Sequence, residues 1–258
     1  IMTVFPCLDY SPESDDIRLN AAIISDTHID ARLPCGKYLL ERAFLDMNGC
    51  SVPTDAVIVT GDLTNYGDDA SVEDFFRILT ESSKAKNAII TMGNHDIGHT
   101  EDLGMTNQQA RDRFIRMHNE YLGTELDKPY YSYVVNGYKF IVICDESEDR
   151  WDTYEIYDEQ IAWLDRELAD GTKDGLPVFV ICHEPYEGIN GQPIVWEGGT
   201  MDEESGRTAS PCRPICWSTA TACRATVSAS KWRSTPTGWC SERGTSSPRS
   251  GICPTNSQ

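Results

Sequence analysis

The sequence lacks several features that would assign the chain to a common class at once. Its 258 residues contain no apolar run of about 18 residues, which a transmembrane helix needs. They contain no basic start followed by an apolar stretch, as in a signal peptide, and no Cys-x-x-Cys pair, as in a zinc ribbon or a thioredoxin-type motif. There is no basic tract, and the net charge of −19 opposes binding to nucleic acid and to anionic membranes. We therefore expect neither a membrane span nor a nucleic-acid partner.

Five of the ten cysteines are scattered over residues 1–204 and do not indicate a disulfide framework there, and the other five lie after residue 205. Cys144 and Cys182 end apolar runs, so we expect them to be small buried thiols. Scattered thiols favour a cytoplasmic location. The chain opens on Ile1 rather than on Met, so we expect residues 1–17 to be a truncated N-terminal extension. A signal lost there would instead make the protein an exported one, and the oligomeric state is left open.

The composition changes near residue 205. Residues 1–204 hold 40 acidic and 15 basic residues, whereas residues 205–258 hold one acidic residue, Glu242, and seven basic residues. The tail is rich in Ser and Thr and has no Leu, Phe, Tyr, Asp, His or Met. A disordered tail, a disulfide-rich appendage and a shifted reading frame are the three interpretations. We favour the frameshift, which would replace the last strands of a domain that covers residues 18–204.

Four short apolar runs in that domain each end in polar residues. The runs RLNAAIIS (18–25), DAVIVT (55–60), NAIITM (87–92) and PVFVIC (177–182) are nearly continuous, as expected for strands buried on both faces. Stretches with helical spacing, at 38–47, 72–79, 106–123 and 157–168, separate them. Alternating strands and helices predict an α/β fold.

Local signals refine these elements. We expect Ser71 and Thr106 to cap their helices and Gly123 to end the second one. Residues 130–144 carry an Asn136-Gly137 turn between two apolar runs and predict a β-hairpin. Part of the sheet is therefore antiparallel.

The polar residues that follow the four strands are potential metal ligands. Ligands of open α/β sheets lie beyond the carboxyl ends of the strands, so these residues can converge. Asp26 and His28 alternate after the first strand, and the two carboxylate oxygens of Asp62 suit a bridge between ions. Asn94 offers a neutral oxygen and His183 a nitrogen. Two ions about 4 Å apart suit an in-line displacement at phosphorus, in which they activate a water.

Other residues near these ligands have more than one interpretation. His95, next to Asn94, is placed to donate a proton to a leaving oxygen, and Asp96 to orient it. Tyr66 and Glu184 are candidates for a substrate pocket, although an ordinary structural role is the simpler interpretation. We interpret His99 and His118 as surface or core histidines. Taken singly, each motif also fits a helix cap or a turn, but their shared order after four strands favours a metal site.

The motifs DTH (26–28), GDLTNYG (61–67), GNHD (93–96) and VICHEP (180–185) resemble those of the calcineurin-like metallophosphoesterases. GDLTNYG resembles the bacterial branch that includes cyclic-nucleotide phosphodiesterase-like proteins. The resemblance implies a four-layer α/β/β/α sandwich of two mixed sheets, with a dinuclear site of Mn, Fe or Zn. Asp26 and His28 would bind one ion, Asn94 and His183 the other, and Asp62 would bridge them. His95, paired with Asp96, would be the catalytic acid.

The sequence departs from the family pattern at one motif. The family has a later Gly-His-x-His motif that gives one imidazole to each ion, but no His follows His183 here. The favoured function is hydrolysis of small phosphomonoesters or phosphodiesters, through in-line attack of a metal-bound hydroxide. The alternatives are a scaffold that has kept the fold without turnover, and a chain that is inactive because this motif is missing.

Overall fold

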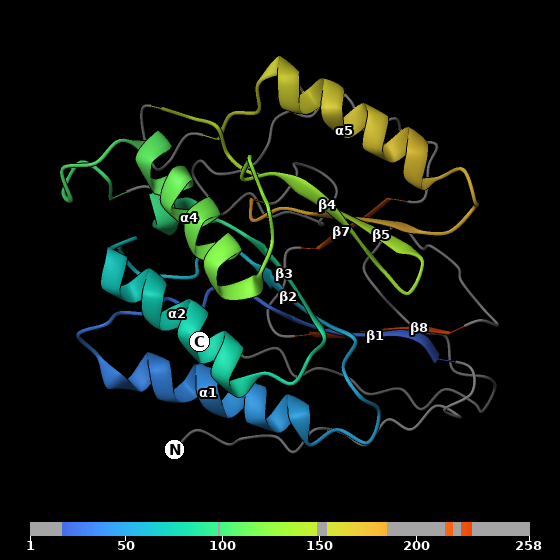
Figure 1. The fold of residues 1–258 in the computed structure, drawn as a ribbon, viewed down its shortest axis with the longest axis horizontal. Helices are drawn as coiled ribbons and strands as arrows, with labels where there is room; N and C mark the ends of the chain where they lie inside the picture. The colour runs from blue at the N-terminus through green and yellow to red at the C-terminus, as the bar shows by residue number, and fades with distance from the viewer. Residues whose placement is uncertain (1–16, 98, 149–153, 185–214, 219–222, 229–258) are drawn as a thin grey trace, which may run out of the picture.

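The computed structural model describes residues 17–97, 99–148, 154–184, 215–218 and 223–228, which form an α/β fold with two sheets (Figure 1). The strands are β1 (Ile17–Ile24), β2 (Ala56–Thr60), β3 (Asn87–Thr91), β4 (Tyr131–Val135), β5 (Tyr138–Val142), β6 (Val178–Ile181), β7 (Ile215–Ser218) and β8 (Cys223–Ser228). The helices are α1 (Pro34–Asn48), α2 (Asp69–Ser82), α3 (Asn94–Ile97), α4 (Asn107–Leu122) and α5 (Asp158–Gly171).

Each sheet has four strands and mixes parallel with antiparallel neighbours. The first has the order β3-β2-β1-β8, in which β1, β2 and β3 are parallel and β8 is antiparallel. The second has the order β4-β5-β6-β7, in which the predicted hairpin β4-β5 is antiparallel and the other pairs are parallel. The carboxyl ends of β1, β2 and β3 therefore meet at one edge of the first sheet.

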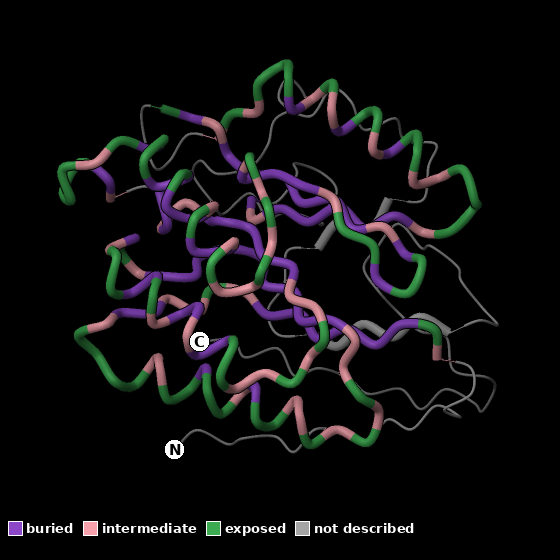
Figure 2. Tube along the Cα trace, in the orientation of Figure 1, coloured by how far each residue is buried: buried purple, intermediate pink, exposed green. Residues whose placement is uncertain are grey.

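Most residues of β1, β2, β3, β5 and β6 are buried, as their apolar sequences predicted (Figure 2). In β4, Tyr133 and Val134 are exposed. Along β1, Leu19, Ala21 and Ile23 pack with residues of β4, β5 and β6, whereas Ala22 and Ile24 pack with α1, α2 and α4. On the far side of the second sheet, Val178 and Val180 pack against α5. Figure 1 shows α5 on one side of the two sheets and α1 and α2 on the other.

The predicted helix caps are confirmed for α4, whereas the cap predicted for α2 is wrong. Thr106 caps α4 in a capping box with Gln109, and Gly123 ends the helix in a left-handed conformation, both as predicted. The cap of α2 is Asp68 rather than Ser71. The helix begins at Asp69, three residues before the predicted start at 72. Asp68 therefore precedes its first turn and accepts the backbone N–H of Ser71 at 3.1 Å.

The remaining expectations concern thiols, the membrane and the tail. Cys144 and Cys182 are buried, as predicted. Among the described residues, no helix combines the length and the apolar character needed to cross a bilayer. Strands β7 and β8 lie in the tail, where the sequence indicated no strand. The rest of the tail, and residues 1–16 of the extension predicted at 1–17, lie outside the described residues, whereas Ile17 begins β1. The frameshift stays a prediction.

Candidate metal centre

The loops that follow β1 and β2 are joined along their backbones and carry Asp26, His28 and Asp62. The Asp26 N–H donates to the Gly61 carbonyl at 3.1 Å, and the His28 N–H donates to the Asp62 carbonyl at 3.0 Å. The third loop joins through His95, whose N–H donates to Asp62 Oδ1 at 3.0 Å. The sheet edge therefore brings the first three motifs together, as the strand order predicted.

Three of the candidate ligands have left-handed backbone conformations. The φ angles are 56° at Asp26, 43° at His28 and 50° at Asp62. Side chains other than Gly rarely adopt such angles, because of steric strain near Cβ, and strained residues concentrate at functional sites. Three such residues in adjoining loops therefore favour a functional site.

Asp62 lies at the centre of two groups of potential ligands. Its Oδ2 is 3.5 Å from Nε2 of His28, and its Oδ1 is 3.3 Å from Nε2 of His183. Ligand atoms of His28, Asp62 and His95 lie within 4.8 Å of one another, and so do those of Asp26, Asp62 and His183. The two oxygens of one carboxylate thus face two separate clusters.

His183 comes from β6 of the other sheet and is held in one orientation. Its Nδ1 donates to the Thr60 carbonyl at 2.8 Å, which directs Nε2 towards Asn94 Oδ1, 3.1 Å away, and Asp62. A backbone partner of this kind commonly fixes a metal-binding imidazole. Burial lowers the pKa of His183, but Asp62 and Glu184 outweigh it and raise the pKa to about 10. The carboxylates around His183 therefore favour a positive charge on or beside its imidazole ring.

Asp26 and His28 form the more exposed side of the centre. Their side chains are 56% and 35% exposed, with 3.8 Å between Asp26 Oδ1 and His28 Nε2. The interaction with His28 lowers the pKa of Asp26, and the interaction with Asp26 raises the pKa of His28. Among the described residues, Nδ1 of His28 has no hydrogen-bond partner. The other ring nitrogen of His28, Nε2, is the one that faces Asp26 and Asp62.

Two glycines allow the close packing of Asp62 and His183. A Cβ built on Gly61 would lie 2.6 Å from Nδ1 of His183, and Gly61 has a φ of +95°. A Cβ on Gly93 would clash with Oδ1 and the backbone nitrogen of Asp62. Both glycines belong to the predicted motifs, and any larger residue at either position would collide with Asp62 or His183.

His95 and Asp96 are both in place, but Asp96 differs from the predicted role. Nδ1 of His95 lies 3.0 Å from the Asn65 carbonyl, so a backbone oxygen positions the ring. The buried Asp96 carboxylate accepts the N–H groups of Leu63 at 3.0 Å and Gly93 at 2.9 Å. It also accepts two hydrogen bonds from Thr64. As a correction, Asp96 joins the loops after β2 and β3, and Asn65 supplies the orienting contact.

The structure also places the residues whose role the sequence left open. His118 is buried in the core, and His99 lies near His95, with 5.8 Å between ring centroids. Glu184 is buried, and burial raises its pKa to about 8. Tyr66 lines a cavity beside the centre. Sequence patterns could not show the contacts of the Thr60 and Asn65 carbonyls, since every residue has a carbonyl.

The donor set fits divalent metal ions. Carboxylate oxygens and imidazole nitrogens are their usual protein ligands. Asn94, beside His183, adds the neutral oxygen that the sequence predicted. Asp26 and His28 lie side by side, as the sequence paired them, and the structure also brings Asp26 near His183 and His95 near His28.

Comparisons with known proteins found one family model and several solved structures that resemble this chain. A family model described as calcineurin-like phosphoesterase matches residues 19–206. Among solved structures, a dimetal phosphatase from Danio rerio matches at 14% identity and a TM-score of 0.49, covering 69% of this chain and 74% of that chain. A phosphopantetheinyl hydrolase from Mycobacterium tuberculosis matches at 18% identity and a TM-score of 0.39, covering 67% and 70%. No match was found among the curated proteins.

Proposed function

Because the chain belongs to the calcineurin-like phosphoesterase family, we propose that it is a metal-dependent hydrolase of small phosphoesters with a dinuclear centre. The proposal includes the four-layer α/β/β/α arrangement, with the centre at the carboxyl ends of the strands. Asp26, His28, Asp62, Asn94 and His183 are the proposed ligands.

The main support for this proposal is that the two carboxylate oxygens of Asp62 face two different groups of potential ligands. One oxygen faces His28 and the other faces His183, at 3.5 and 3.3 Å. A carboxylate that served only one cation would not need both oxygens directed at separate imidazoles. Its side chain is only 5% exposed, so water screens its charge poorly.

The protein's own groups then divide the work. Bound ions of this kind supply Lewis-acid activation of water and charge compensation at phosphoryl oxygens. The Asn65 carbonyl fixes Nδ1 of His95, so Nε2 is the atom that gives a proton to the leaving oxygen. Asp62 Oδ1, which accepts the His95 N–H, ties this residue to the ligands. Asp96 holds the loop that carries His95 in place, because its carboxylate accepts buried hydrogen bonds from the N–H groups of Leu63 and Gly93.

The decisive experiment measures metal content and turnover in the same protein samples. We expect about two metal ions per chain by elemental analysis after loading with Mn²⁺. The same samples should hydrolyse p-nitrophenyl phosphate or bis-p-nitrophenyl phosphate. In His95→Ala, turnover should fall by about 100-fold or more while the metal content is unchanged, because a general acid is lost and no ligand is. The control is Asp112→Asn, at an exposed position of α4.

The outcomes of this experiment separate the roles of His95. A loss of one ion in His95→Ala would show that His95 is a metal ligand. Its ligand atom lies within 4.8 Å of those of His28 and Asp62, which is close enough for that role. Turnover in the absence of metal would overturn the proposal.

A scaffold without turnover is the second candidate, and one observation favours it. No His follows His183 in the sequence, so the family's last motif contributes no imidazole. Metal binding without turnover would support the scaffold. Resequencing the gene and assaying the chain in a restored frame is the matched comparison, and activity that appears only then would support the frameshift.

A further inference from the structure

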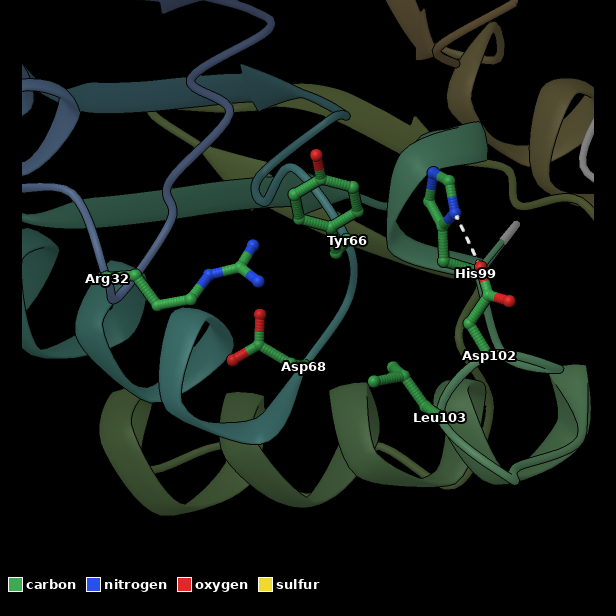
Figure 3. A pocket seen from close by; sticks show the side chains of 6 residues that line it. All are labelled: Arg32, Tyr66, Asp68, His99, Asp102 and Leu103. Atoms are coloured by element: carbon green, nitrogen blue, oxygen red, sulfur yellow. Dashed lines mark ion pairs between the residues drawn. The ribbon is translucent and has the colours of Figure 1, made fainter.

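The structure contains a cavity of about 300 Å³. Figure 3 shows the side chains that line it. Its lining residues come from the loops that carry the proposed ligands, and they are Arg32, Tyr66, Asp68, His99, Asp102 and Leu103. The volume is at the lower end of the range for small-molecule sites, roughly 300–1,000 Å³. The proposed function does not use these side chains.

A row of aromatic rings connects the metal centre with this cavity. The His95 ring lies 4.6 Å from the His28 ring, and the His99 ring follows at 5.8 Å from His95. Tyr66 is next, with 5.1 Å between its ring centroid and that of His99. The cavity therefore begins on the side of His95. If His95 gives its proton to the leaving oxygen, the alcohol that carries this oxygen extends towards the cavity.

The aromatic and apolar part of the lining is held in place and exposed. Tyr66 is 40% and Leu103 is 39% exposed, although both are large hydrophobic residues. The guanidinium carbon of Arg32 lies 4.9 Å from the Tyr66 ring centroid. Asp30 fixes this guanidinium with hydrogen bonds of 2.7 and 2.8 Å. A rigid ring beside an open cavity suits contact with the carbon skeleton of a small organic group.

The charges at the cavity oppose a second anion. Asp30 already neutralises Arg32, so the carboxylates of Asp68 and Asp102 remain in excess. Asp68 is fixed as the cap of α2, where its two oxygens accept the Ser71 N–H at 3.1 Å and the Ser71 hydroxyl at 2.6 Å, so it acts at the cavity through its charge. The Asp102 side chain is 85% exposed, and its Oδ2 lies 3.5 Å from Nδ1 of His99. Carboxylates accept hydrogen bonds from hydroxyl and ammonium groups and repel anions.

We propose that this cavity, lined by Tyr66, Asp68 and Asp102, is the subsite for the alcohol portion of the ester. It selects small alcohols that carry hydroxyl or amino groups over alcohols that carry a second anionic group. This inference rests on the proposed function and names the substrate class of the same centre.

The test uses three esters on one two-carbon skeleton: 2-hydroxyethyl, 2-aminoethyl and carboxymethyl phosphate, each as the monoester and the methyl diester. Hydrolysis by the full metal-loaded chain is followed by ³¹P NMR. We expect kcat/KM for the hydroxyethyl and aminoethyl esters to exceed that for the carboxymethyl ester by about tenfold or more, because like charges repel at short range.

Variants assign the selectivity to the cavity. In Asp68→Asn combined with Asp102→Asn, the preference should shrink to about threefold or less through changes in KM, since the like-charge repulsion is removed. Asn at position 68 keeps a good helix cap, so α2 should remain folded. Tyr66→Ala should raise KM for all three esters with little change in kcat, and Tyr66→Phe should restore KM because it keeps the ring. Asp112→Asn is the matched control on α4.

The possible failures are distinguishable. Turnover of bis-p-nitrophenyl phosphate with no preference among the three esters, or with a preference that the variants leave unchanged, overturns the subsite and leaves the proposed function standing. Absence of turnover with every ester overturns both.

Discussion

Asp62 and His183 come from different sheets, and their side chains meet with 3.3 Å between Oδ1 and Nε2. β2 delivers the carboxylate and β6 the imidazole, and the Thr60 carbonyl at the end of β2 fixes the imidazole from behind. Because both side chains are largely buried, their charges interact in a medium of low effective dielectric. The contact makes the centre depend on the packing between the sheets.

The shared carboxylate predicts that one substitution removes both ions. In Asp62→Asn, the side chain keeps its size but loses its charge and one of its two acceptor oxygens. We expect the metal content to fall from about two ions per chain to well below one, because both clusters lose their common ligand. Elemental analysis after gel filtration measures this. Retention of a full ion in Asp62→Asn would show that the clusters are independent, and Asp112→Asn provides the background.

The close approach of Asp62 to Gly93 predicts a defect in metal binding. In Gly93→Ala, the new Cβ would clash with Asp62, so we expect a loss of metal and of turnover. Gly104→Ala is the matched control, because a Cβ there meets no atom within 4 Å, although its φ of +66° costs about 1 kcal/mol. Thermal unfolding and elemental analysis of both variants separate strain from clash. Equal metal content in both would contradict the steric argument.

The elements around the centre were predictable because burial leaves a strong pattern in the sequence. Strands such as β2 and β3 are buried on both faces, so their sequences are continuously apolar and end where the polar ligands begin. Parallel pairing then places these ends at one edge. The convergence of Asp26, Asp62 and His95 follows from this topology, without knowledge of the loop conformations.

The loop conformations around the ligands were not predictable from spacing. Asp26 and His28 have left-handed backbones, which direct their side chains differently from those of an extended strand. The role of Asp96 was missed for a related reason. Its partners are backbone N–H groups of Leu63 and Gly93, and backbone donors carry no signal in a sequence.

The buried hydrogen bonds of Asp96 predict a loss of stability that is independent of metal. In Asp96→Asn, one acceptor oxygen becomes an amide donor that faces the donors of Leu63, Thr64 or Gly93. We expect the free energy of unfolding to fall by roughly 2–3 kcal/mol, because buried polar groups are left without partners. Urea unfolding in the presence of a chelator measures this loss without a contribution from bound ions. Unchanged stability in chelator would show that the carboxylate matters only for the metal centre.

The buried His118 predicts a pH dependence of stability. Burial lowers its pKa from 6.5 to about 4, with Nδ1 bonded to Thr124 Oγ1 at 2.8 Å and Nε2 3.3 Å from the Tyr131 hydroxyl. Between about pH 6.5 and 4 the unfolded chain binds this proton and the folded protein does not, so the stability conferred by the neutral ring is lost as the pH falls through that window. The full difference corresponds to on the order of 3 kcal/mol.

The comparison of the parent chain with His118→Gln isolates this contribution. Urea unfolding between pH 7 and pH 4, in chelator, should show a shallower decrease of stability in the variant, by at most about 1.4 kcal/mol per pH unit for one proton. The variant should be less stable at pH 7, because it loses the ring and its contacts, and the difference should narrow towards pH 4. Parallel curves for the two proteins would mean that His118 does not titrate in this range and that carboxylates alone cause the acid destabilisation.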